Sequence, residues 1–204
     1  MHILAIGAHP DDIEYGCGGT LLRYARRGHG VYLYVATKGG LGGNAHVRWG
    51  EQEAAAAKIG ARDVFFGGYS DGGVPANRTL IDSIEGVIQR VQPDVIFVHY
   101  RDDTHQDHRA LAEATVTATR YVHNVLFYEV PTTQNFSPHI YVDIQETLED
   151  KIELLRSHAS QVTKTNIADM TIVDLARSTA NFRGIEGRVK YAEAFDSLRM
   201  FIEI

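Results

Sequence analysis

Short apolar runs alternate along this chain with longer stretches that mix apolar and polar residues. A short run that contains β-branched and aromatic side chains is typical of a buried strand, whereas the mixed stretches have the length of helices. The strands predicted in this way cover residues 3–8, 31–36, 64–67, 95–100, 126–130 and 139–144. The predicted helices cover about 18–30, 51–59, 80–91, 105–122, 147–159 and most of 172–198, and the apolar end, Met200–Ile204, is a candidate edge strand.

Strands that alternate with helices of about 10–15 residues form βαβ units, whose strands are parallel. We therefore expect an α/β fold of the Rossmann-like kind, with a mainly parallel sheet and helices on both faces. The sequence contains no repeat, linker or low-complexity segment, so residues 1–204 are expected to form a single domain. In such folds ligands bind beyond the carboxyl ends of the strands. The residues after the first, third and fourth strands are therefore the first candidates for chemistry.

Composition narrows the class of protein. The 44% hydrophobic and 23% charged residues are ordinary for a soluble globular protein, and the net charge of −6 argues against a nucleic-acid surface. No apolar run approaches the roughly 20 residues that cross a bilayer, and the start of the chain lacks the basic region of a signal peptide. The single cysteine, Cys17, excludes an intramolecular disulfide. We expect a cytoplasmic protein that binds neither nucleic acid nor membrane.

Three segments rich in glycine are interpreted separately: two are predicted to be a loop and a turn, and the third to pack closely against its neighbours. Residues 38–50 contain five glycines and no hydrophobic period, so we predict a loop, either a lid over a substrate or a plain surface loop. The segment S-D-G-G at 70–73 is a predicted turn. The segment G-C-G-G-T at 16–20 lacks the G-x-G-x-x-G spacing of a dinucleotide-binding loop. Its glycines are better explained by close packing of the loop after the first strand and the first helix.

Polar side chains gather after the first and fourth predicted strands. Because neighbouring parallel strands end at the same edge of a sheet, these two clusters can meet. A spacing of three residues, which places two side chains on one side of a helical turn, separates His9 from Asp12 and His105 from His108. Buried charges at such positions are costly unless they are paired or bind a metal. The clusters consist of His9, Asp11 and Asp12 after the first strand, and of Asp102, Asp103, His105, Asp107 and His108 after the fourth.

Two histidines and an aspartate with an open fourth position suit a catalytic zinc ion, although iron(II) or manganese would accept the same ligands. The metal would lower the pKa of a bound water, a carboxylate beside it would take the proton, and an imidazole would stabilise an oxyanion. Two other interpretations stay open. Asp11 or Asp12 is a possible N-cap of the following helix. The carboxylates would also suit Mg²⁺ in a nucleotide-binding or regulatory module.

The motifs A-H-P-D-D-I-E (8–14), G-C-G-G-T (16–20) and H-Q-D-H (105–108) resemble those of the LmbE/PIG-L family of zinc-dependent N-acetylglucosaminyl-type deacetylases. The resemblance extends through the rest of the chain. It includes R-W-G-E (48–51), S-D-G-G (70–73) and R-G-I-E-G-R-V-K-Y-A-E-A-F (183–195). The chain departs from the usual H-P-D-H pattern at Gln106, which leaves every reactive group in place.

The resemblance implies a role for each matching residue. Those implied for the metal site are His9, Asp12 and His108 as ligands, Asp11 as general base, His105 as oxyanion stabiliser or helper of the leaving amine, and Asp107 as the aspartate that orients an imidazole. Arg48 and Asp71 match positions that hold sugar hydroxyls in relatives. The resemblance further implies a hydrolase, in a homo-oligomer, that removes an N-acetyl group from a small amino sugar or GlcNAc-containing conjugate. An enzyme acting on a different amide, such as a thiol conjugate, is the closest alternative.

Overall fold

A computed structural model describes residues 1–202 of the chain. Seven strands form one sheet in the order β3-β2-β1-β4-β5-β7-β6. The first five strands run parallel, and β7 is antiparallel to both of its neighbours, β5 and β6. The strands are β1 His2–Gly7, β2 Gly30–Thr37, β3 Asp63–Tyr69, β4 Val95–His99, β5 Asn124–Tyr128, β6 Ile140–Asp143 and β7 Ala192–Arg199. The predicted Rossmann-like α/β fold is confirmed.

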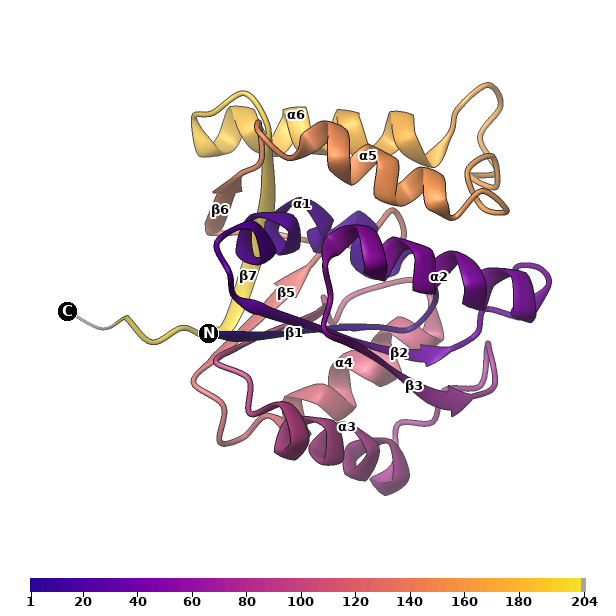
Figure 1. Ribbon diagram of the computed structural model, residues 1–204, viewed down its shortest axis with the longest axis vertical. Helices are drawn as coiled ribbons and strands as arrows, with labels where there is room; N and C mark the ends of the chain where they lie inside the picture. Colours follow the sequence, from indigo (N-terminus) through magenta and orange to yellow (C-terminus); the bar gives the residue numbers. More distant parts are fainter. Residues whose placement is uncertain (203–204) are drawn as a thin grey trace.

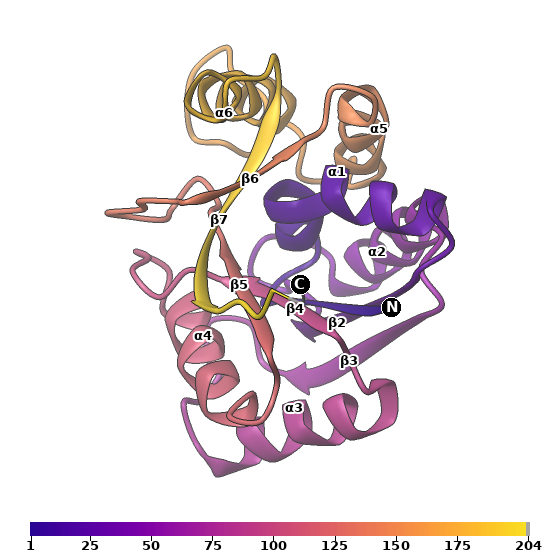
Figure 2. The same cartoon turned by 90° about the vertical axis from the view of Figure 1, so that its left-hand side faces the viewer.

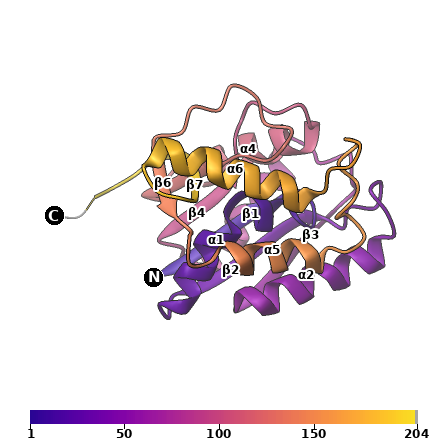
Figure 3. The same ribbon diagram turned by 90° about the horizontal axis from the view of Figure 1, so that it is seen from above.

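Helices cover both faces of the sheet, as the alternation of elements predicts. Figure 2 shows α1, α2, α5 and α6 on one side of the strands and α3 and α4 on the other. The helix α6 lies over β6 and β7, while α5 lies against α1 and α2 (Figures 1 and 3). The helices are α1 Asp12–Arg26, α2 Ala45–Ile59, α3 Arg78–Val91, α4 Gln106–Ala118, α5 Leu148–Ser157 and α6 Ile172–Gly187.

The two faces of the sheet have separate apolar cores because successive strand residues point to opposite sides. On β1, for example, Ile3 and Ala5 belong to the core beneath α1 and α2, whereas Leu4 and Ile6 belong to the core above α3 and α4. All four side chains are fully buried. This pattern explains why the parallel strands have continuous apolar sequences, since both of their faces are covered.

The first helix begins at Asp12, six residues before the predicted start at residue 18. Glycine disfavours helix, but close packing overrides that preference here. A Cβ atom at Gly16 would lie 2.1 Å from the Tyr128 ring, and one at Gly19 would lie 2.9 Å from the Ile144 side chain. The glycines therefore let α1 approach the sheet and the segment before α5, as the sequence indicates.

Three further expectations are wrong in part. The predicted loop 38–50 ends early, because Asn44 caps α2 by accepting hydrogen bonds from the backbone N–H groups of His46 and Val47. The predicted helical tail, 172–198, contains both α6 and the strand β7, because the chain turns through a left-handed residue at Arg188. Residues 200–202 continue β7 without joining the sheet, and the rest of the candidate edge strand, 203–204, lies outside the described residues.

Candidate metal centre

A tight turn between β1 and α1 brings His9 and Asp12 together. The backbone N–H of Asp12 is 3.4 Å from the His9 carbonyl oxygen, and Asp11 has φ 101° and ψ −25°. These angles resemble the second central residue of a type II β-turn, in which Pro10 occupies the favoured first central position. The spacing of three residues predicts a helical turn for His9 and Asp12, but the structure has a β-turn there. The Asp12 carboxylate accepts hydrogen bonds from the backbone N–H groups of His9, at 2.7 Å, and Ala8, at 3.1 Å.

The second pair of predicted residues lies at the start of α4. His105 is the N-cap residue, and its Nδ1 accepts a hydrogen bond from the Asp107 backbone N–H at 3.2 Å. His108 follows in the first turn, where its ring stacks on that of His105 with centroids 4.6 Å apart. Here the spacing of three residues does place two imidazoles on one side of a helix. The N-cap thereby directs the His105 ring toward the end of β1.

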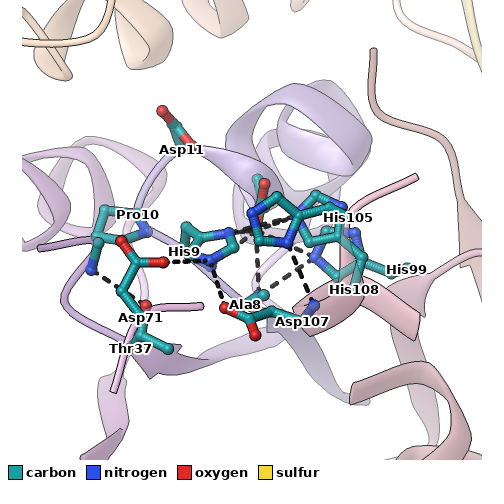
Figure 4. Close-up of polar contacts among 12 residues, drawn as sticks. Ala8, His9, Pro10, Asp11, Thr37, Asp71, His99, His105, Asp107 and His108 are labelled. Carbon is teal, nitrogen blue, oxygen red and sulfur yellow. Dashed lines mark hydrogen bonds and ion pairs between the residues drawn. The ribbon is translucent and has the colours of Figure 1, made fainter. Parts of the chain in front are cut away.

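The two clusters meet because β1 and β4 are adjacent strands. The Nδ1 atom of His9 is 3.3 Å from Nε2 of His108, and the Asp12 Oδ2 atom is 3.4 Å from the first and 3.5 Å from the second. Zinc–nitrogen distances of about 2.0–2.1 Å give tetrahedral edges of about 3.3–3.4 Å. The three atoms therefore have the mutual separations of three zinc ligands. Figure 4 shows the imidazoles of His9, His105 and His108 grouped at this point.

The outer nitrogens of His9 and His108 each face a carboxylate. His9 Nε2 is 3.0 Å from Asp71 Oδ1 and 3.0 Å from Asp107 Oδ2, and His108 Nδ1 is 3.2 Å from Asp103 Oδ2. A carboxylate that accepts the outer N–H leaves the inner nitrogen with a free lone pair, which is how proteins orient metal-binding histidines. The donor set and its surroundings thus fit a divalent cation.

The charges around the cluster also favour a cation. Burial alone would lower the pKa of His9, but hydrogen bonds to Asp107, Asp12 and Asp71 raise it to about 12. Burial alone would raise the pKa of Asp12, but the nearby imidazoles of His108 and His99 hold it well below its usual range. A positive charge at His9 is therefore stabilised by three carboxylates, and the same carboxylates would stabilise a metal ion.

Sequence reasoning did not identify His99, the last residue of β4. Its side chain is fully buried, its ring stacks on His108 with centroids 4.0 Å apart, and its Nε2 is 3.1 Å from Asp12 Oδ2. Burial and the neighbouring His108 lower the pKa of His99 to about 4, so the ring is neutral. The sequence contains one indication of this role, because His99 is the only polar residue of the otherwise apolar strand β4.

Several combinations of these residues place ligand atoms within 4.8 Å of one another, so the donor set is larger than one triad. These groups are His9 with His105 and His108, Asp12 with His99 and His108, and His9 with Asp71 and Asp107. Asp103 was placed in the second cluster by the sequence, but its role was not assigned. It contacts His108 and accepts a hydrogen bond from the Thr133 hydroxyl at 3.0 Å.

Asp11 occupies the N-cap position of α1, but its side chain makes no capping hydrogen bond. Figure 4 shows the Asp11 carboxylate apart from the grouped imidazoles. Burial and the adjacent Asp12 raise the pKa of Asp11 to about 6, and its Oδ2 is 3.4 Å from Nη2 of Arg48. The pKa is thus closer to neutrality than that of an ordinary carboxyl group, as general acid–base catalysis requires.

The two residues expected to hold sugar hydroxyls both have partners within the protein. Arg48 is 4% exposed and donates hydrogen bonds to the carbonyl oxygens of Gly39 and Pro10, each at 2.7 Å. The Asp71 carboxylate contacts His9 through one oxygen and accepts the Leu41 backbone N–H through the other, at 2.7 Å. The hydrogen bond with His9 lowers the pKa of Asp71 to about 2.

Comparison with known proteins identifies the family. The model of the family "PIG-L: GlcNAc-PI de-N-acetylase" matches residues 4–119, which contain both clusters. The chain belongs to the PIG-L family. It is 34% identical over 167 residues to the uncharacterized deacetylase YaiS of Escherichia coli, covering 78% of this chain and 90% of YaiS.

Two further relatives extend this likeness. The chain is 28% identical to a probable N-acetyl-α-D-glucosaminyl L-malate deacetylase 2 of Bacillus cereus, covering 78% of this chain and 83% of that protein. The conserved protein TT1542 of Thermus thermophilus has the same fold, with a TM-score of 0.88, 26% identity and coverage of 99% of this chain and 96% of that one. Within residues 1–202, no helix is long and apolar enough to span a bilayer.

Proposed function

We propose that this PIG-L family protein is a metal-dependent hydrolase that removes an N-acetyl group from a small amino sugar or GlcNAc-containing conjugate. The observation that carries the proposal is the set of three ligand atoms on His9, Asp12 and His108, whose separations of 3.3–3.5 Å match a zinc site. Support for the substrate comes from the family description and from the relatives that are deacetylases.

His9, Asp12 and His108 would hold the metal, with zinc as the first choice and iron(II) or manganese as alternatives that the same ligands accept. A metal bound there would polarise the amide carbonyl and bring the pKa of a water molecule to about 7. Asp107 and Asp71 would keep the His9 ring in the orientation that the ligand role requires. Asp103 would do the same for His108.

Asp11 would act as the general base that takes a proton from the attacking water. Its pKa of about 6 keeps the carboxylate mostly ionised at neutral pH while leaving it basic enough to accept a proton. His105 would stabilise the oxyanion that develops on the amide carbonyl or help the amine to leave. Burial and the nearby imidazoles of His108 and His9 lower the pKa of His105, which favours its neutral form. Its ring centroid lies 4.6 Å from that of His9.

Asp71 lies at this cluster and is the residue that we propose to contact a sugar hydroxyl. Its carboxylate already has two protein partners, so a hydroxyl would share an oxygen with the Leu41 N–H or with His9. Arg48, the other residue expected to hold a sugar hydroxyl, has its guanidinium buried among backbone carbonyls, which argues against a sugar contact there.

The proposal is tested by measuring acetate release from N-acetylglucosamine, several of its glycosides and N-acetylated thiol conjugates without a sugar. We expect release from at least one amino sugar, loss of release after chelation, and recovery on adding zinc, iron(II) or manganese. Release from the thiol conjugates alone would move the substrate class to another amide. The proposal fails if metal-loaded, folded protein releases acetate from none of these compounds.

A further inference from the structure

Arg48, on the first turn of α2, is locked beneath the glycine-rich segment that precedes this helix. Its Nη1 donates to the Gly39 carbonyl and its Nη2 to the Pro10 carbonyl, each at 2.7 Å, while Nη2 also lies 3.4 Å from Asp11 Oδ2. The residue is 4% exposed, and its Nε is buried without a hydrogen-bond partner. Both terminal nitrogens of the guanidinium therefore donate to the protein backbone, and only Nε lacks a partner.

Two glycines make room for this guanidinium. A Cβ atom at Gly39 would lie 2.0 Å from Nη1 of Arg48, and one at Gly42 would lie 2.6 Å from the same atom. A Cβ atom at Gly40, in contrast, would meet nothing closer than the Ala45 Cβ at 3.7 Å. The segment is thus fitted to the Arg48 side chain at Gly39 and Gly42 and not at Gly40.

The Pro10 carbonyl belongs to the central peptide of the β-turn from His9 to Asp12. Types I and II of this turn differ in the orientation of that peptide, and type II needs a positive φ at the next residue, which favours glycine. Asp11 occupies that position with φ 101°, a conformation that is costly for a residue with a Cβ atom. A fixed donor on the Pro10 carbonyl stabilises the costly orientation.

We propose that Arg48 is a positioning residue that holds the central peptide of the His9–Asp12 turn, and through it the Asp11 carboxylate, in place for catalysis. The same guanidinium contacts the peptide and the carboxylate, so one side chain fixes both the backbone and the side chain of Asp11. This inference rests on the proposed function for the catalytic role of Asp11, but the contact itself does not depend on the substrate.

The kinetic test compares the variants R48M, R48K and G42A with the control G40A, on whichever N-acetylated substrate the wild type hydrolyses. We expect R48M to lower kcat by about 10²-fold, as misplacement of a catalytic group by about 1 Å does, with little change in KM and with metal content retained. R48K should retain more of kcat than R48M. G42A should lower kcat because its Cβ displaces the guanidinium, and G40A should behave as the wild type.

A direct substrate contact gives the opposite pattern. If R48M raises KM and leaves kcat unchanged, Arg48 binds substrate and the positioning role is wrong. The role is also wrong if G42A and G40A have the same kcat as the wild type.

A second test needs no activity and therefore separates this inference from the proposed function. The free energy of unfolding is measured by urea denaturation for the wild type, R48M, D11G and the double variant. Glycine adopts a positive φ without help, so removing Arg48 should cost less stability in the D11G background than in the wild type. Equal losses in the two backgrounds would overturn the inference, whether or not the protein proves to be a deacetylase.

Discussion

At the scale of single residues, Asp11 combines a reactive carboxylate with an unfavourable backbone conformation. Its φ of 101° lies in the region that glycine tolerates best, and burial together with Asp12 raises its pKa to about 6. Backbone strain of this kind persists where the surrounding structure enforces it, often at functional sites. The residue therefore connects local geometry with the proposed chemistry.

Replacing Asp11 should separate activity from stability. Both D11A and D11G remove the general base, so each should lower turnover by about 10²–10⁴-fold, as measured by acetate release. D11G also removes the conformational cost and should be more stable than D11A by about 1–2 kcal/mol in urea denaturation. A D11A variant with normal turnover would show that another group takes the proton.

Cys17 should be inert toward thiol reagents in the folded protein. Its side chain is fully buried in α1, and burial raises the pKa of the thiol well above its ordinary value, so the reactive thiolate is scarce at pH 8. Labelling by a chromogenic disulfide should follow unfolding, with rapid reaction in denaturant as the control. Rapid and complete labelling of the native protein would contradict the buried position.

The sequence predicted most of the candidate cluster but few of its supporting contacts. Residue types and spacing placed His9, Asp12 and His108 in two candidate clusters, and the family resemblance implied that they are ligands. The structure brings them within 3.5 Å of one another, and their role as ligands stays a prediction. Spacing along the chain contains no information on what a strand-end side chain touches, so His99 was missed. For the same reason the burial of Arg48 beneath the glycines was not predicted.

At the scale of elements, a buried ion pair attaches α1 to α5 and β7. Lys151 Nζ is 2.6 Å from Glu193 Oε1 and donates to the Tyr15 carbonyl at 2.5 Å. The Glu193 carboxylate accepts the backbone N–H groups of Gly19 and Thr20, at 2.8 and 2.7 Å. Because α1 begins at the turn from His9 to Asp12, this attachment helps to set the position of the whole cluster.

Breaking this pair should be costly. K151M leaves the Glu193 carboxylate buried without its counter-ion, and such a change costs about 3–5 kcal/mol of stability. The control R26A breaks an exposed pair with Asp150, whose side chains are 50% and 49% exposed, and should cost about 0–1 kcal/mol. Urea denaturation measures both. Similar losses in K151M and R26A would contradict the structural role of the pair.

Element boundaries were predicted less well than element types, for physical reasons. The start of α1 contains glycines against which Tyr128 and Ile144 pack, and these contacts cannot be derived from the residues of α1 alone. The start of α2 depends on the Asn44 cap within a glycine-rich segment, where the apolar period is absent. The strand β7 was assigned to a helix because its position between β5 and β6 cannot be derived from its own residues.

At the scale of the whole molecule, the candidate site lies between β1 and β4, where the order of strands in the sheet changes direction. Strand order β2-β1-β4 places the connection through α1 on one face and the connection through α3 on the other, so the ends of β1 and β4 mark the switch point at which ligands bind in such sheets. The sequence predicted that ligands bind beyond the strand ends. It did not establish that β1 and β4 are neighbours, because strand order depends on long-range pairing.

The expected homo-oligomer and the cytoplasmic location stay predictions. Met200, Phe201 and Ile202 are 52%, 59% and 72% exposed on the segment that follows β7 (Figure 1), where the Phe201 backbone N–H donates to Asn124 Oδ1. Burial of these side chains in a subunit contact would stabilise an oligomer. Light scattering should give the wild type a molar mass that is a multiple of the chain mass. The double variant F201D/I202D should have a smaller molar mass. A wild-type monomer at high concentration would contradict the prediction.

The most direct test of the metal centre is the metal content of folded protein that has been loaded with zinc and desalted. The wild type should retain about one ion per chain, whereas H9A and H108A should retain much less because each removes one of three ligands. The control H139A changes a histidine whose side chain is 76% exposed and should match the wild type. A folded wild type that retains no zinc, iron or manganese, or an H9A variant that retains a full equivalent, would contradict the account.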